Sequence, residues 1–308
     1  MNKFNQLKYF ELNVNAPLFK ALSDDEPEWW EKLKADSRVY INVRHGGYIN
    51  VYFRGESIMK LEYRKRSYRA KINTSYLSDE EKRGKQKDMA PEDIVERLDE
   101  IIDRMQRRKP NGKPEGDSEE GLKGALFMSG DYIDTEFAYM RKARPSEIEA
   151  RKRNANSSGT KRICPYAQDR IDLVRVDDGA IQYVELKRIS DPRLNRHDRA
   201  SECEAEIVEQ MLDYQHILDI YKDMILSYYQ AVQQVMKNLG IRNGAVNQEI
   251  TRVSESVELY IAGYKDGKSY NKKRYNRIQT LQKLLKDKGL VCSNIDAVLD
   301  DYLKLRKV

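Results

Sequence analysis

The chain has 308 residues, of which 40% are hydrophobic and 34% are charged, and its formal net charge is +6. This length allows one large domain or two small ones, with a core that needs no metal or disulfide to fold. The composition excludes a wholly disordered chain, and the three cysteines form no CxxC pair, so neither a zinc site nor a disulfide framework is indicated. No apolar run approaches the roughly 20 residues that span a bilayer, and no signal-peptide pattern opens the chain. We expect a cytoplasmic protein without a membrane partner.

Residues 1–85 predict an N-terminal β-rich unit. Alternating Tyr, Val and Ile residues over 38–77, with two glycine turn signals, are typical of an antiparallel meander. Before it, a short helical pattern over 24–35 contains Trp29 and Trp30 and is expected to pack on those strands.

Residues 86–123 predict a helix followed by a charged linker. Pro91 begins the helix, and an apolar stripe at helical spacing continues it to about Arg107. The segment 109–121 has two prolines, three glycines and dense charge, which indicates an exposed connection and the domain boundary.

Residues 124–308 predict a mixed α/β domain. The elements expected from periodicity and turn signals are a strand at 125–140, a basic loop at 143–162, a hairpin with strands near 169–176 and 181–187, a long helix at 201–239, a strand at 257–264, a helix at 275–288, a short strand at 290–292 and a helix from 296.

The hairpin carries charged residues inside apolar strands. Its Asp-Asp-Gly turn places Asp172 on the incoming strand and Glu185 and Lys187 on the outgoing one. Because strand side chains alternate, Glu185 and Lys187 should point to the same face, and the apolar residues beside them to the other.

Charged residues in a strand interior need a partner or a metal to compensate their desolvation. Mg²⁺ keeps several waters and takes one or two protein carboxylates, so Asp172 and Glu185 are candidate ligands. Lys187 would then orient or help to deprotonate the attacking water and offset charge on a phosphate. The alternative is a surface ion pair on an edge strand.

An Asp, a short hairpin and then Glu-x-Lys resemble the PD-(D/E)xK nuclease superfamily. The motif positions fall on Asp172, Glu185, Leu186 and Lys187. The resemblance covers residues 125–295 and implies a restriction-endonuclease-like α/β fold, a mixed sheet flanked by helices, here with the N-terminal β-rich unit added. It also implies that the carbonyl of Leu186 joins the metal shell. Ile171 stands where the family name has proline.

The resemblance implies further site residues on either side of the hairpin. Family members often carry an additional upstream acid, and alternation puts Asp134 and Glu136 on one strand face. We favour Glu136 as the extra metal ligand, with Asp134 as its substitute. A Gln-x-x-x-Tyr pair after the motif matches Gln210 and Tyr214, which share a helix face and could together reach the metal-bound water or the phosphate. The alternatives are a solvent-facing acid, a surface glutamine and a core tyrosine.

Basic residues follow the motif and recur near the C-terminus. Those directly after the motif are Arg188, Arg193, Arg196 and Arg199. With Lys272 and Arg274 they could track a phosphate backbone, although a solvated surface is the alternative. No serine elbow, histidine cluster or Walker loop is present, which disfavours acyl transfer and ATP hydrolysis.

We expect a nuclease that uses Mg²⁺ (or Mn²⁺) and acts on nucleic acid, with DNA favoured. The resemblance implies a bacterial restriction, antiviral defence or repair setting. Two alternatives stay open: a catalytically inactive nucleic-acid-binding or scaffold protein on a nuclease fold, and an RNA-directed nuclease. The sequence also leaves open a homo-oligomer or a partner protein as activator.

Overall fold

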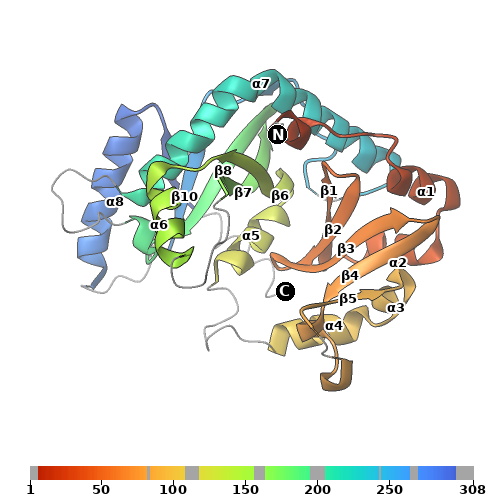
Figure 1. Ribbon diagram of the computed structural model, residues 1–308. Helices are drawn as coiled ribbons and strands as arrows, with labels where there is room; N and C mark the ends of the chain where they lie inside the picture. Colours follow the sequence, from red (N-terminus) through yellow and green to blue (C-terminus); the bar gives the residue numbers. More distant parts are fainter. Residues whose placement is uncertain are drawn as a thin grey trace.

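The structure is a computed structural model, and it describes seven stretches of the chain. They are residues 6–81, 84–107, 118–155, 164–194, 205–242, 244–263 and 270–295. Within them, the chain forms two β-sheets flanked by helices (Figure 1), which places it in the α/β class. No helix in these stretches is both long enough and apolar enough to cross a membrane.

The first sheet is an antiparallel meander in the order β1-β2-β3-β4-β5. Its strands are β1 (Val39–Arg44), β2 (Tyr48–Phe53), β3 (Glu56–Arg64), β4 (Ser67–Asn73) and β5 (Gln86–Met89). The helices around it are α1 (Pro17–Asp25), α2 (Glu28–Ala35), α3 (Pro91–Glu96) and α4 (Leu98–Arg107), with short 3₁₀ turns at Thr74–Tyr76 and Asp79–Glu81. A further 3₁₀ turn at Gln6–Phe10 contacts β6 and α7 of the second sheet, described next. The predicted meander is confirmed, and the sheet continues past residue 85 because β5 pairs with β4.

The second sheet is mixed, in the order β11-β10-β8-β7-β6, with the short β9 beside β8. Its strands are β6 (Tyr132–Lys142), β7 (Tyr166–Asp177), β8 (Ala180–Arg188), β9 (Arg252–Val253), β10 (Glu258–Ala262) and β11 (Val291–Asn294). The first three strands are antiparallel, whereas β10 runs parallel to β8 and to β11. The helices are α5 (Glu119–Phe127), α6 (Pro145–Ala155), α7 (Glu206–Asn238), α8 (Tyr270–Asp287) and a 3₁₀ turn at Pro192–Leu194.

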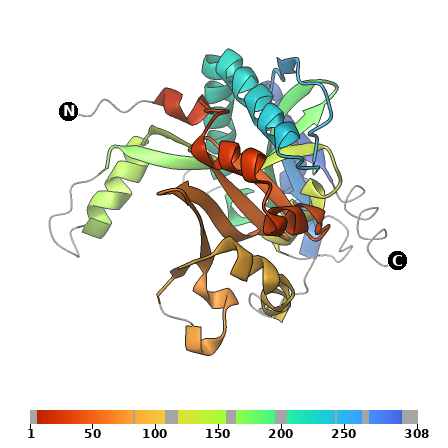
Figure 2. The same cartoon turned by 90° about the vertical axis from the view of Figure 1, so that its right-hand side faces the viewer.

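Helices cover both faces of the second sheet. On one face, Leu122 and Leu126 of α5 share a core with Val184 and Leu186 of β8. On the other face, α7 packs against the remaining side of the sheet in the main core. With 33 residues, α7 is about 50 Å long, and it contacts both β1 and β8 (Figures 1 and 2). Residues of β1 belong to both buried clusters, so the two sheets share their core rather than having one each.

Buried polar contacts join the first sheet to the second. Arg44 of β1 forms an ion pair with Asp134 of β6, and both side chains are buried. Next to this pair, Asn42 donates a hydrogen bond to the Thr135 hydroxyl at 2.7 Å. Since an unpaired charge in a core is costly, this contact fixes how β1 lies on β6.

Some predicted elements are wrong. The strand expected from residue 125 begins only at Tyr132, because 119–127 form helix α5. The loop expected at 143–162 contains α6, and the helix expected over 91–107 is interrupted between α3 and α4. The helix expected from 296 lies outside the described residues.

Candidate active site

The hairpin of β7 and β8 brings three charged side chains together. A two-residue turn, Asp178-Gly179, has positive φ at both positions, as a tight hairpin requires. The ladder between the strands ends at the pair Leu173 and Val184. One residue further on, Asp172 Oδ2 accepts a hydrogen bond from the Leu186 amide at 3.1 Å. The Asp172 carboxylate thus takes the place of a backbone carbonyl as the acceptor for the Leu186 amide, at the point where the ladder ends.

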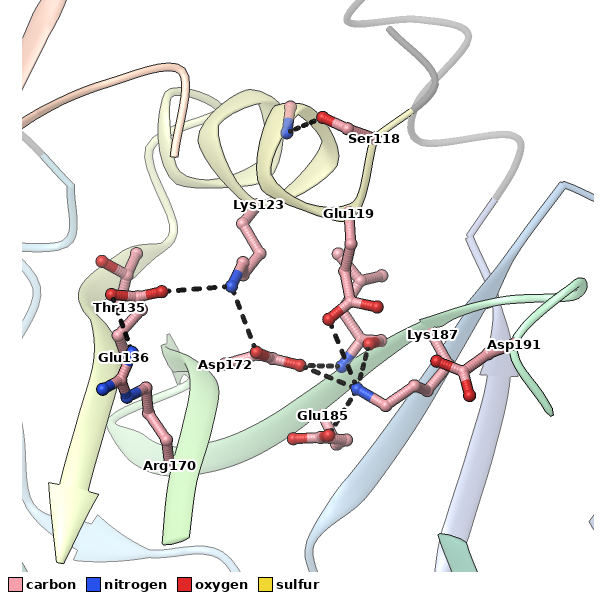
Figure 3. A network of polar contacts seen from close by, with 12 residues as sticks. Ser118, Glu119, Lys123, Thr135, Glu136, Arg170, Asp172, Glu185, Lys187 and Asp191 are labelled. Carbon is pink, nitrogen blue, oxygen red and sulfur yellow. Dashed lines mark hydrogen bonds and ion pairs between the residues drawn. The ribbon is translucent and has the colours of Figure 1, made fainter. Parts of the chain in front are cut away.

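Lys187 lies at the centre of this cluster (Figure 3). Its Nζ is 2.5 Å from Glu185 Oε1, 3.2 Å from Asp172 Oδ2 and 2.7 Å from the carbonyl oxygen of Leu186. The predicted shared face of Glu185 and Lys187 is confirmed. These two residues are 2% and 1% exposed, and β8 lies between β7 and β10. The alternative of a surface ion pair on an edge strand is wrong.

Helix α5 adds two residues that the sequence did not predict. Lys123 Nζ lies 3.3 Å from Asp172 Oδ1, and Glu119 Oε1 lies 3.5 Å from Lys187 Nζ. Glu119 and Lys123 are four residues apart, so they share a helix face. The sequence feature that could have indicated this helix is its N-cap, Ser118. The Ser118 hydroxyl accepts a hydrogen bond from the Gly121 amide at 3.0 Å.

Glu136 joins the cluster through an irregularity in β6. Its φ is +54°, and the ladder pairs Thr135 and Phe137 with β7 on either side of it. Glu136 Oε1 is 3.3 Å from Lys123 Nζ. The expected shared face with Asp134 is wrong, because Asp134 is buried against Arg44 instead. Asp134 is therefore no substitute ligand.

Gln210 and Tyr214 lie behind Glu185. The Gln210 amide donates to Glu185 Oε1 at 2.8 Å and to the Tyr214 hydroxyl at 2.6 Å. The Tyr214 hydroxyl in turn donates to the carbonyl of Arg170 at 2.8 Å. Tyr214 is only 1% exposed, so it orients Gln210 from within the core and does not face solvent.

The other predicted residues are the basic ones that follow the motif and recur near the C-terminus. Arg188 ends β8, and Arg193 pairs with Asp191 at 2.7 Å, so its charge is already partnered. Arg196 and Arg199 are outside the described residues. Lys272 and Arg274 belong to α8, and only their backbone is described.

Burial and the two lysines shift the pKa values of the acids in opposite directions. Burial alone would raise the pKa of Asp172, but the ammonium groups of Lys187 and Lys123 outweigh it and hold that pKa below its usual value. Burial, reinforced by the Asp172 carboxylate, raises the pKa of Glu185. Burial would lower the pKa of Lys187, yet Glu185 and Asp172 raise it, so Lys187 stays protonated. Burial also raises the pKa of Glu119.

The donor set fits a hard divalent cation. Among the described residues, the carboxylates of Glu119, Glu136, Asp172 and Glu185 face the ammonium groups of Lys123 and Lys187 and the guanidinium of Arg170, which leaves a formal excess of one negative charge. Within the described residues, the buried Oε2 of Glu185 accepts no hydrogen bond. In the described stretches, no three Asp, Glu, His or Cys side chains are arranged so that they could hold a metal ion. The ammonium groups of Lys123 and Lys187 lie among the carboxylates of the cluster.

Comparisons with protein-family models, with curated proteins and with solved structures find no match. What the cluster can do must therefore be inferred from its own residues.

Proposed function

We propose that this protein is a nuclease that depends on Mg²⁺ or Mn²⁺ and hydrolyses phosphodiester bonds. The observation that carries the proposal is the buried cluster of Asp172, Glu185 and Lys187, in which one carboxylate oxygen of Glu185 has no partner among the described residues. Buried charges that are not fully satisfied are characteristic of sites that bind or react.

The fold supports this proposal at the level of its class. A mixed sheet with helices on both faces is what a restriction-endonuclease-like core requires, and here the sheet presents Asp172 and Glu185 on adjacent strands. The Asp, hairpin and Glu-x-Lys resemblance adds the expectation of a PD-(D/E)xK nuclease, set in restriction, defence or repair.

Asp172, Glu185, Glu136 and the carbonyl of Leu186 would hold the cation. When bound, a divalent cation supplies Lewis-acid stabilisation of the charge that develops on the phosphate. Lys187 is held protonated by its acidic neighbours, so it would donate hydrogen bonds to a phosphate oxygen or to the attacking water rather than remove a proton. Gln210 would fix the orientation of the Glu185 carboxylate.

The substrate we favour is DNA. A net charge of +6 suits a polyanion, and Arg170, whose side chain is 55% exposed, lies 3.7 Å from Glu136 at the rim of the cluster. An arginine in this position could contact a phosphate next to the one that is cleaved.

The test is cleavage of single- and double-stranded DNA and RNA with Mg²⁺, Mn²⁺ or EDTA by the wild type, by Lys187→Met and by Lys152→Met as a surface control. We expect metal-dependent cleavage that survives in Lys152→Met and falls by about a hundredfold or more in Lys187→Met. Thermal melting of each variant shows that the chain is folded. Binding of nucleic acid without cleavage under any condition would favour the inactive scaffold, and cleavage of RNA alone would favour the RNA-directed nuclease.

A further inference from the structure

The Lys123 ammonium lies between two of the carboxylates assigned to the cation. Its Nζ is 3.3 Å from Asp172 Oδ1 and 3.3 Å from Glu136 Oε1 (Figure 3). The other oxygen of Asp172 faces Lys187 at 3.2 Å. Each oxygen of Asp172 therefore faces one ammonium group. The Lys123 ammonium also faces Glu136.

Helix α5, which carries Lys123, also touches the first sheet. Gly124, the next residue, approaches the β2–β3 turn so closely that a Cβ there would lie 2.6 Å from the carbonyl carbon of Arg54. A Cβ on Gly55 of the same turn would collide with the carbonyl oxygen of Glu120. Two glycines thus let helix and turn meet backbone to backbone. The Lys123 side chain, next to this contact, is 7% exposed.

An ammonium group and a divalent cation compete for the same oxygens. Carboxylate oxygens that bind a hard cation must be free of other positive charge at short range, because like charges a few ångströms apart repel strongly in a buried site. Lys123 contacts the two acids from separate strands, β6 and β7, and so lies where a cation bridging those strands would bind.

We propose that Lys123 is a resident counter-ion that occupies the cation position between Asp172 and Glu136, and that a divalent metal must displace it to bind there. This rests on the metal-binding part of the proposed function, but not on catalysis. Helix α5, which carries Lys123, packs on the second sheet through Leu122 and Leu126 and touches the first sheet at Gly55.

The experiment is a titration with Mn²⁺, in which free Mn²⁺ is measured by electron paramagnetic resonance, on the wild type and three variants. Lys123→Met keeps the length of the side chain and removes its charge. Lys123→Arg keeps the charge. Lys32→Met removes a surface lysine that pairs with Glu28 on α2, far from the cluster in sequence, and serves as the matched control.

We expect Lys123→Met to bind Mn²⁺ about tenfold more tightly or better, while Lys123→Arg and Lys32→Met bind no more tightly than the wild type. Lys123→Met should also gain more thermal stability from Mn²⁺ than the wild type does. If Lys123 only stabilised the fold, its loss would leave Mn²⁺ affinity unchanged or reduced, and that result overturns the proposal. Absence of binding in all four proteins overturns it as well. Tighter binding without cleavage of any nucleic acid upholds this proposal while the proposed nuclease function fails.

Discussion

The Glu185 carboxylate is held on one oxygen only. Oε1 receives the Lys187 ammonium at 2.5 Å and the Gln210 amide at 2.8 Å, whereas Oε2 has no partner among the described residues. The Gln210 amide is in turn fixed by Tyr214. Two donors on one oxygen orient the other oxygen, and that orientation is what a metal ligand needs.

Replacing Gln210 tests this orientation. We expect Gln210→Ala to lower kcat of the metal-dependent cleavage by about 10- to 100-fold, the usual cost of losing a residue that orients a ligand. Its free energy of unfolding should fall by only about 1 kcal/mol, because one hydrogen bond is lost. Steady-state kinetics and urea denaturation measure the two effects. Lys222→Ala, on the same helix but paired with Glu255, is the control. Unchanged kcat in Gln210→Ala would remove Gln210 from the site.

His45 makes the free energy of unfolding depend on pH. Burial first, and then the positive charges of Arg44, Lys8 and Lys60, lower the pKa of His45 to about 4 from its usual 6.5. Since the unfolded chain binds a proton on this group at a higher pH than the folded chain does, its contribution to stability is complete above pH 6.5 and is lost as the pH falls towards 4.

We expect His45→Gln to lack this loss. Between pH 7.5 and pH 4 the wild type should lose about 1 to 2 kcal/mol more of its free energy of unfolding than the variant, after allowance for partial solvent screening. Urea denaturation at both pH values measures the difference. Parallel loss of stability in the two proteins would show that His45 titrates alike in the folded and unfolded states.

At the scale of elements, the hairpin could be predicted from sequence because its pattern is local. The Asp-Asp-Gly turn fixes the register of β7 and β8, and strand alternation then places Glu185 beside Lys187. Nothing beyond those residues was needed to bring the centre of the site together. The meander of the first sheet was predictable for the same reason.

The rest of the site could not be predicted because it depends on tertiary packing. Helix α5 contains Gly121 and Gly124, residues that weaken a helix, and it follows a segment rich in Pro and Gly, so its sequence resembles a linker. It is helical because its apolar residues cover the sheet. Glu136 breaks strand alternation through a positive φ, a conformation that the sequence does not predict for a glutamate.

The close packing of α5 predicts a cost for a larger residue at Gly124. Gly124→Ala would gain about 1 kcal/mol from helix propensity in an open helix. Here its Cβ would lie 2.6 to 2.7 Å from the backbone of Arg54 and Gly55, and overpacking of this kind costs about 1 to 3 kcal/mol. Because α5 and the β2–β3 turn must also move apart to make room for the Cβ, we expect the free energy of unfolding, measured by urea denaturation, to fall by about 2 kcal/mol. A gain in stability would show that α5 is not held by this contact.

At the scale of the whole molecule, the first and second sheets behave as parts of one core. Ile41 of β1, Phe137 of β6 and Tyr229 of α7 belong to the same buried cluster. The buried ion pair of Arg44 with Asp134 adjoins that cluster, because the Tyr229 hydroxyl donates to Asp134 Oδ2 at 3.4 Å. A buried charge that loses its partner destabilises a protein by about 3 to 5 kcal/mol. Neither sheet can therefore separate from the other without exposing apolar surface and an unpaired charge.

This shared core predicts that the protein unfolds in a single transition. Its only two tryptophans, Trp29 and Trp30, are buried on α2 against the first sheet, so their fluorescence reports on that sheet. Circular dichroism at 222 nm (the helical band) reports on the helices around both sheets, among them α7, which contacts both β1 and β8. We expect both signals to have the same urea midpoint, and Asp134→Ala to lower both midpoints together. Separate midpoints would instead mean that the first sheet unfolds independently, and that its contact with α5 can be released while the second sheet stays folded.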